Sequence, residues 1–326
     1  MILPFIAGFI SFVTVLYFTP WMIRYLRRIG LVVKDQNKKD KPLIPISGGL
    51  SVIAGIFISV MFYVFIRTFY FNDSGSLLVI FASLASLLVI TFVGFFDDLL
   101  IRKDKESSSG LKQWQKPLLT LMAAVPLIVI SAGNSTVGIP ALGVVDFGLW
   151  YSLLLVPLGV VFSANVVNLL AGFNGMETGM GLIYTGMLGL YAYANDSYVA
   201  ALIALVTFSA LLAFFFYNKF PSRIFPGDSL TYLLGGAIAV IGITGDIERA
   251  ALIAGIPFVI EFFLKLRSRF KAQTYGYYFN GKVKTDYGKV YSIPHLFTRT
   301  GKFTEKQIVW IMMLIELIFC SIIWVI

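Results

Sequence analysis

Apolar residues occupy long uninterrupted runs of this chain, and polar residues collect in the connections between them. Ten runs of about 16–23 residues can each cross a hydrocarbon core of about 30 Å as a helix. The pattern therefore predicts an all-α integral membrane protein with ten transmembrane helices. The runs cover residues 2–23, 48–70, 77–96, 117–132, 149–170, 179–194, 198–217, 229–244, 249–270 and 305–326.

Two connections have a different pattern, because apolar and polar residues alternate in them. Residues 133–148 alternate enough to predict a small hairpin. The last long connection reads YGYYFNGKVKTDYGKVYSI, and its Asn280-Gly281 pair between alternating runs predicts a β-hairpin with a two-residue turn. Because the sequence contains no repeat and no low-complexity tract, we expect residues 1–326 to form one membrane domain with a modest cap at 271–304.

The composition agrees with a membrane protein. Of the 326 residues, 58% are hydrophobic and only 13% are charged, whereas soluble domains are about 25% charged. The single cysteine, Cys320, excludes an intrachain disulfide, and the single histidine, His295, argues against histidine-rich metal sites and most histidine-based triads. Because charges follow the first apolar run instead of preceding it, we interpret this run as a membrane helix and not as a cleavable signal.

The net charge of +9 is distributed unevenly along the chain. Alternate connections contain 24 of the 26 basic residues: seven in 24–47, five in 97–117, two in 218–228 and ten in 265–306. The positive-inside rule then places these four connections in the cytoplasm and both termini outside. The short run at 179–194 is the weakest of the ten, and its loss would invert the topology after it. The positive-inside rule explains how the basic residues are distributed, and no nucleic-acid partner is expected.

Under this topology, polar residues from separate runs gather at the cytoplasmic end. Asp97 and Asp98 end the third run, where the helix dipole and their mutual repulsion disfavour two carboxylates. They are solvated interfacial charges, or they form a salt bridge to Arg102 or Lys103, or their repulsion is offset by a divalent cation or a basic phosphate-binding partner. Adjacent helical residues point about 100° apart, so one could face a metal while its neighbour accepts a proton.

Other polar residues at this end have structural explanations as well as functional ones. Asn165 and Asn168 share a helix face, where interhelical hydrogen bonds are common. Asp228 follows Pro-Gly, as an ordinary N-cap residue does. The glycines of AGFNGMETGMG either pack helices closely or let backbone N–H groups approach a phosphate. Lys116 is by default a snorkelling cation that marks the membrane edge.

Three ordered segments, FVGFFDDLL, NVVNLLAGFNGMETG and FPGDSLTYLLG, resemble the polyprenyl-phosphate N-acetylhexosamine-1-phosphate transferases. The resemblance runs from about DQNKKDKPLIPISGG to IPHLFTRTGK, which is most of the chain. It implies a ten-helix fold, in agreement with the count from hydropathy and charge. It also implies that a lipid phosphate attacks the β-phosphate of a UDP-sugar at the cytoplasmic face, giving a polyprenyl-linked sugar pyrophosphate and UMP.

The resemblance also implies roles for individual residues. Asp228 and Asn168 would hold Mg²⁺, with Mn²⁺ as an alternative, and Asp97 and Asp98 would bind or deprotonate the lipid phosphate. Such roles suit a reaction between two anions, which depends on positioning and charge neutralisation. Lipid-phosphate contacts are implied for Lys116 and Asn165, and nucleotide-sugar contacts for Gly172, Asn174, Glu177, Phe225, His295 and Arg299.

The wording LAGFNGME and the single histidine of the last loop are closer to the dolichol branch of the family than to the bacterial peptidoglycan enzymes. We therefore expect transfer of GlcNAc 1-phosphate to dolichyl phosphate, as the first membrane step of N-glycan or other surface glycan assembly, in an archaeal cell membrane. Ile46 stands where the eukaryotic branch has Glu, which leaves the identity of the hexosamine open. The family also leads us to expect a homodimer surrounded by membrane lipids.

Three other classes of membrane protein compete with the transferase. A membrane prenyltransferase also uses aspartates and Mg²⁺, but the sequence lacks DxxxD motifs, and the DGxxAR pattern of CDP-alcohol transferases is missing too. A membrane transporter would place polar residues near the bilayer centre. Here the ionisable residues lie at one surface, with Glu261 as the nearest exception. The transporter remains the alternative to the transferase.

Overall fold

The computed structural model describes residues 2–100, 110–139 and 143–325 and is mostly helical. The long helices of this part are α1 (Ile2–Arg28), α2 (Gly49–Phe69), α3 (Leu77–Leu99), α6 (Val156–Leu169), α7 (Met176–Ala194), α8 (Tyr198–Asn218), α9 (Gly227–Thr244) and α13 (Glu305–Ile322). The shorter ones are α4 (Gln115–Thr120), η1 (Leu121–Ala124), α5 (Val125–Ile130), η2 (Tyr151–Leu155), α10 (Glu248–Ala254), α11 (Ile256–Leu266) and α12 (His295–Thr298).

The predicted apolar runs are helical in the structure. In the described residues, six helices are long and apolar enough to cross a membrane, namely α1, α2, α3, the continuous η2–α6, α8 and α9. The run predicted at 117–132 is a shorter apolar helix that extends from Gln115 to Ile130. The run at 249–270 is divided into α10 and α11 at Gly255, two residues before Pro257, because proline interrupts a helix and is tolerated in its first turn.

Within residues 2–100, 110–139 and 143–325 the strands form three two-stranded antiparallel pairs: β1 (Val32–Lys34) with β2 (Leu43–Pro45), β3 (Thr136–Ile139) with β4 (Gly143–Asp146), and β5 (Tyr277–Phe279) with β6 (Lys282–Lys284). Both predicted hairpins are therefore confirmed. In the β5–β6 turn, Asn280 and Gly281 have φ values of 48° and 81°, which is the left-handed conformation that a two-residue turn requires. The β1–β2 pair was not predicted.

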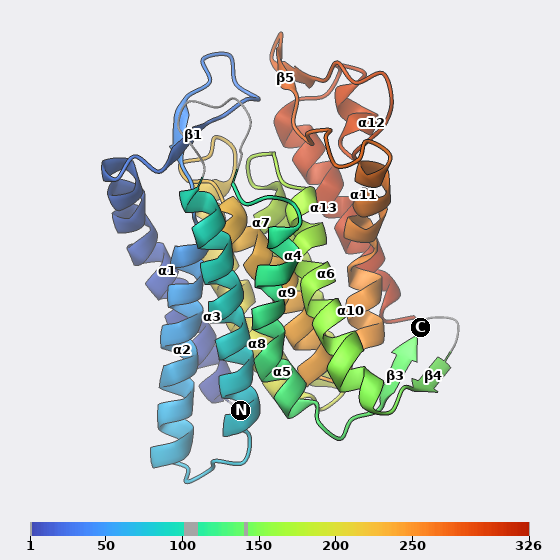
Figure 1. Cartoon of the computed structure of the whole chain (residues 1–326). Helices are drawn as coiled ribbons and strands as arrows, with labels where there is room; N and C mark the ends of the chain where they lie inside the picture. Colours follow the sequence, from blue (N-terminus) through green and yellow to red (C-terminus); the bar gives the residue numbers. More distant parts are fainter. Residues whose placement is uncertain (1, 101–109, 140–142, 326) are drawn as a thin grey trace.

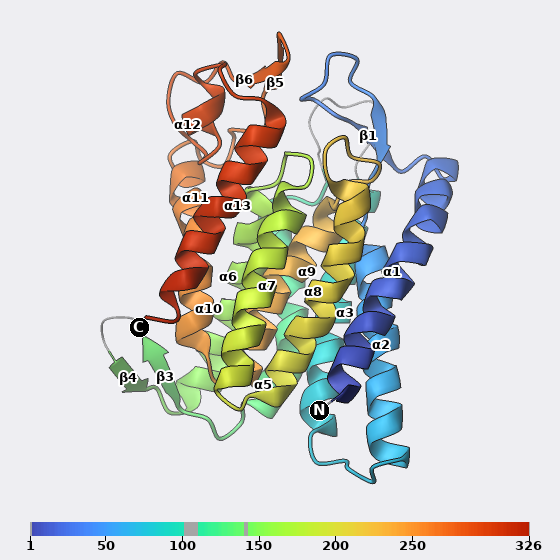
Figure 2. The same ribbon diagram turned by 180° about the vertical axis from the view of Figure 1, so that it is seen from behind.

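The helices form one bundle between two loop-rich ends (Figure 1). One end carries β1, the β5–β6 hairpin and α12, and the other end carries β3 and β4. The reverse view shows that α1 begins, and α13 ends, in the half that carries β3 and β4 (Figure 2). The basic connections predicted for the cytoplasm thus include the segments that carry β1 and β5–β6.

The centre of the bundle is α9, which is buried along nearly its whole length and packs against α3, α6 and α8. Glycines make this packing very close. A Cβ atom on Gly94 of α3 would meet the backbone carbonyl of Asp228, and a Cβ atom on Gly235 would meet the backbone of Ser163 in α6. The contact at Gly94 brings the end of α3 against the beginning of α9, and the contact at Gly235 brings α6 against the middle of α9.

Candidate active site

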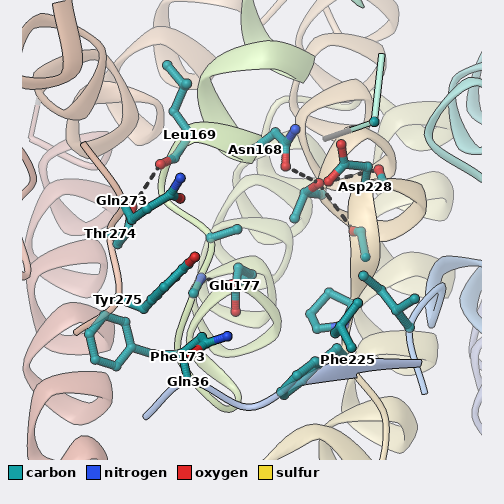
Figure 3. Close-up of a pocket in the computed structure, with 18 of the residues that line it drawn as sticks. Gln36, Asn168, Leu169, Phe173, Glu177, Phe225, Asp228, Gln273, Thr274 and Tyr275 are labelled. Carbon is teal, nitrogen blue, oxygen red and sulfur yellow. Dashed lines mark hydrogen bonds between the residues drawn. The ribbon is translucent and has the colours of Figure 1, made fainter. Parts of the chain in front are cut away.

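A pocket of about 320 Å³ lies between the ends of these helices (Figure 3). Its wall consists of residues from β1 and the segment after it, the end of α3, the end of α6 with the following loop, the beginning of α9, and residues 270–275. These segments are far apart in sequence. They meet because α3 and α6 both pack against α9, which brings their ends together.

A charge cluster, formed by Asp97, Lys116 and Asp228, lies in the pocket wall. The Lys116 Nζ atom is 2.6 Å from Asp97 Oδ2 and 3.0 Å from Asp228 Oδ2. Asp97 also accepts hydrogen bonds from the Leu111 backbone N–H at 2.6 Å and from the Tyr232 hydroxyl at 3.3 Å. Because Lys116 forms ion pairs with two carboxylates, it belongs to the charge cluster and is not simply a cation at the membrane edge.

Asn168 lies beside Asp228 in the pocket (Figure 3). Its Oδ1 atom accepts a hydrogen bond of 2.9 Å from the hydroxyl of Thr231, one turn along α9. Among the described residues there is no group of three or more His, Cys, Asp or Glu arranged to hold a metal ion. An ion at this place would instead be held by one carboxylate and one amide oxygen, the kind of incomplete oxygen set with which Mg²⁺ binds substrate phosphates.

Asp228 is not the N-cap residue of α9 that its sequence context suggested. Helix α9 begins at Gly227, and Pro226 occupies the N-cap position without a capping side chain. The backbone N–H groups of Asp228 and Ser229 donate instead to the carboxylate of Asp98, at 2.8 and 3.2 Å. The N-terminus of α9 is thus capped by a side chain from α3, which leaves the Asp228 carboxylate directed towards Lys116.

Away from the charge cluster, the pocket is lined by aromatic residues, Phe173, Phe225 and Tyr275 (Figure 3). Glu177 also lines this part and accepts a hydrogen bond of 2.6 Å from the Gly172 backbone N–H through Oε1. Its other oxygen, Oε2, is buried and has no hydrogen-bond partner. This end of the pocket can therefore stack against a planar group and accept a hydrogen bond from it or from a hydroxyl.

The pocket includes seven of the twelve predicted site residues and leaves out Asp98, Asn165, Asn174, His295 and Arg299. The Asn165 amide donates to Thr120 Oγ1 at 3.2 Å and to the Val161 carbonyl at 2.8 Å, which is the structural alternative considered for it. The Asn174 amide donates to Asp35 at 3.0 Å and to Glu305 at 2.6 Å, and its oxygen accepts from the Ser222 N–H at 2.7 Å. Both amides are therefore already engaged within the protein.

His295 belongs to the predicted cap at 271–304, is fully buried and does not line the pocket. Its Nδ1 atom accepts a hydrogen bond of 3.3 Å from the Tyr291 N–H, so Nε2 carries the proton that is shared with the Gln273 carbonyl at 2.9 Å. Arg299, the residue directly after α12, is exposed. In this structure His295 supports the pocket segment at 272–275 from behind, and Arg299 lies outside it.

Several pocket residues were missed by the sequence analysis, among them Gln36, Phe173, Lys265, Thr274 and Tyr275. The Nζ atom of Lys265 donates to the Ala272 carbonyl at 2.7 Å and to Thr274 Oγ1 at 2.8 Å, so it holds the pocket segment in place. Phe173 lies within the segment NVVNLLAGFNGMETG but was not singled out there, and the other four residues lie outside the family motifs. Only the aromatic run that starts at Tyr275 could have drawn attention to them.

Asn37 was also missed, although it does not itself line the pocket. Its amide donates to the Gly172 carbonyl at 2.9 Å, and its oxygen accepts from the Gly276 N–H at 3.1 Å. It is buried and joins the connection after β1, the loop after α6 and the segment before β5. The pocket wall is therefore held together by side chains that sequence spacing does not reveal.

The apolar bundle, with charged and aromatic residues around a pocket at one end, has the features of an integral membrane protein with a polar ligand site. Residues 80–246, about half of the chain, match glycosyl transferase family 4. The matched part contains the charge cluster and Asn168 and ends before the segment at 270–275. The chain belongs to this family.

Relatives from three groups of organisms are similar over most of the chain. A protein of Saccharolobus solfataricus, named as a candidate UDP-N-acetylglucosamine–dolichyl-phosphate N-acetylglucosaminephosphotransferase, is 39% identical over 97% of this chain and 93% of its own length. The protein of that activity from Dictyostelium discoideum is 28% identical over 86% of this chain and 77% of its own. The phospho-N-acetylmuramoyl-pentapeptide-transferase of Lactiplantibacillus plantarum is 33% identical over 77% and 78%.

The buried imidazole predicts a component of the acid sensitivity of the fold. Burial lowers the pKa of His295 to about 4, from the model-peptide value of 6.5. The unfolded chain therefore binds a proton in the window between these two values while the folded chain does not, so stability falls as the pH decreases through it. In detergent, we expect the unfolding midpoint of the wild type to decrease more than that of His295→Gln when the pH is lowered from about 7 to about 5.

All other titrating groups are common to the two proteins, so the difference between their pH dependences isolates His295. An equal decrease in both proteins would contradict a buried neutral imidazole.

Proposed function

We propose that this protein transfers a sugar 1-phosphate, GlcNAc 1-phosphate in the first instance, from a UDP-sugar to dolichyl phosphate or a related polyprenyl phosphate. A phosphate oxygen of the lipid forms a bond to the β-phosphorus of the donor, the bond from this phosphorus to the bridging oxygen breaks, and UMP leaves. The proposal is supported by family membership and by the names of the relatives. The observation that carries it is the sharing of Lys116 by Asp97 and Asp228 in a pocket with an aromatic end.

The charge cluster suits the phosphate groups of both reactants. The Lys116 ammonium can bind a phosphate oxygen, and Asp97, hydrogen-bonded to Lys116, Leu111 and Tyr232, fixes where that ammonium lies. The side chains of Lys116 and Asp228 retain 23% and 22% exposure, so an entering phosphate can reach them. Asp97 is also the member of the aspartate pair that can accept a proton in the pocket.

We further propose that Asp228 and Asn168 hold a divalent ion, Mg²⁺ or Mn²⁺. Their carboxylate and amide oxygens are hard ligands of the kind that these ions prefer, and the open pocket leaves room for phosphate oxygens and water to complete the coordination. When bound, the ion would neutralise charge on the pyrophosphate. Lys116, now paired with Asp228, is the protein's own cation at this place.

The aromatic end is the proposed site for the nucleotide part of the donor. Phe225, Phe173 and Tyr275 supply planar surfaces for the uracil ring. The unpartnered Oε2 atom of Glu177 is available to a donor group such as a ribose hydroxyl or an imide N–H. A donor bound in this way would place its pyrophosphate towards Asp228.

If the metal-binding proposal is correct, Asp228→Ala should lower the release of UMP from UDP-GlcNAc in the presence of dolichyl phosphate by about a hundredfold or more, because electrostatic stabilisation of the reacting phosphates is lost. EDTA should stop the wild-type reaction, and added Mg²⁺ or Mn²⁺ should restore it. Asp196→Ala, which removes an exposed carboxylate near the opposite end, is the matched control. Turnover close to that of the wild type in Asp228→Ala, or in EDTA, would contradict the scheme.

We also propose that all ten predicted segments span the membrane as one domain, with both termini outside, the pocket end in the cytoplasm and residues 271–304 as a cap over the substrate. The four segments beyond the six long apolar helices are helical and lie in the same bundle. The proposed location is the cell membrane. We expect an archaeal membrane, because the sequence resembles the dolichol branch of the family. A homodimer stays a prediction.

The orientation can be tested with cysteine variants, because the free Cys320 is buried and can be replaced by serine. In that background, Lys39→Cys lies in a basic connection at the pocket end, and Ser74→Cys lies between α2 and α3 at the other end; both positions are exposed. In intact cells a membrane-impermeant maleimide should label Ser74→Cys only, and permeabilised cells should show labelling of both. Labelling of Lys39→Cys in intact cells would reject the proposed topology.

A further inference from the structure

We propose that Asp98 is a positioning residue. Its carboxylate binds the end of α3 to the first turn of α9 and thereby sets the position of Asp228, whereas Asp97 is the member of the pair that contacts the reactants. The proposal deepens the proposed function, on which it relies for the identity of the reactants.

The contacts of Asp98 are all within the protein. It is fully buried, it does not line the pocket, and both of its carboxylate oxygens are engaged. Oδ1 accepts from the Asp228 N–H at 2.8 Å, and Oδ2 accepts from the Ser47 hydroxyl at 2.7 Å and from the Ser229 N–H at 3.2 Å. A carboxylate with these three donors has little capacity left for a lipid phosphate.

The surrounding backbone leaves no path from Asp98 to a substrate. Gly227, with φ of 70°, packs directly on the carboxylate, where a Cβ atom would also meet the Ser47 backbone N at 2.7 Å. A Cβ atom on Gly49 would meet the backbone of Ser229, and one on Gly94 would meet that of Asp228. Asp98 is thus enclosed where α2, α3 and α9 come together.

Asp97 lies in a different environment, although it is the adjacent residue. Successive helical residues point about 100° apart, so the two carboxylates leave α3 in different directions. Asp97 points into the pocket and contacts Lys116 at 2.6 Å. The pair that the sequence presents as one motif is therefore divided between a reactant-facing group and an internal one.

Asp98 acts on the pocket through Asp228. The first N–H groups of a helix have no partner within it, and a carboxylate is their best acceptor. Here the N–H of Asp228 is held by Asp98, while the side chain of the same residue faces Lys116 and lies beside Asn168. If the hydrogen bond is lost, the first turn of α9 can shift, and the Asp228 carboxylate shifts with it.

The test compares Asp98→Asn, Asp98→Ala and Asp97→Asn in the purified full chain. Asn at position 98 can still accept an N–H bond through its oxygen, and its amide can donate to Ser47, so it should keep UMP release within about tenfold of the wild type. Asp98→Ala keeps neither bond, and Asp97→Asn loses the charge opposite Lys116. Both should lose more activity than Asp98→Asn does.

A second readout follows the position of Asp228 without using activity. Electron paramagnetic resonance of free and bound Mn²⁺ should give a dissociation constant about tenfold higher for Asp98→Ala than for the wild type, the factor expected when a hydrogen bond to a charged group is lost. Ser47→Ala, a milder variant in case Asp98→Ala does not fold, should shift it in the same direction. It should leave the KM for dolichyl phosphate unchanged.

If Asp98→Asn were as inactive as Asp98→Ala, and if Mn²⁺ affinity were unchanged in Asp98→Ala and Ser47→Ala, the positioning role would be overturned and Asp98 would have to act on a reactant. If instead the wild type bound Mn²⁺ but released no UMP, the proposed function would fail alone, since the Mn²⁺ comparison would still decide the role of Asp98.

Discussion

The pocket depends on holding three carboxylates at one end of a bundle of apolar helices. A buried carboxylate without a compensating partner costs on the order of several kcal/mol. Asp98 is compensated by the first N–H groups of α9, and Asp97 and Asp228 share Lys116. Within the charge cluster two carboxylates share one lysine, which leaves room for a further cation, as a reaction between two phosphates requires.

The close packing of α9 explains why these groups meet. Glycines at the contacts let α3 and α6 approach its backbone, so the ends that carry Asp97 and Asn168 lie beside its first turn. The opposite wall has a different support, because residues 272–275 are held by hydrogen bonds from Lys265 and His295. One side of the pocket is thus formed by closely packed helix ends that carry the charge cluster, and the opposite wall is formed by the last long connection.

The sequence predicted the helical segments, both hairpins and seven of the pocket residues, because hydropathy, the Asn-Gly turn and the family motifs are local signals. It did not reveal the internal hydrogen-bond partners of Asp98, Asn174 and His295, since these partners lie on segments far away in the chain. Asp228 was ambiguous for the same reason, because the residue that caps α9 belongs to α3. Lys265 and Asn37 belong to no motif, and only the folded chain shows what they join.

Asp97 and Lys116 are expected to work as one unit, and a double-mutant cycle measures the coupling between them. The values of kcat/KM for UMP release would be measured for the wild type, Asp97→Asn, Lys116→Met and the double variant. Because the two side chains are 2.6 Å apart, the double variant should lose little more activity than the worse single variant. If the loss in the double variant were the product of the two single losses, the two residues would act independently and the account would be contradicted.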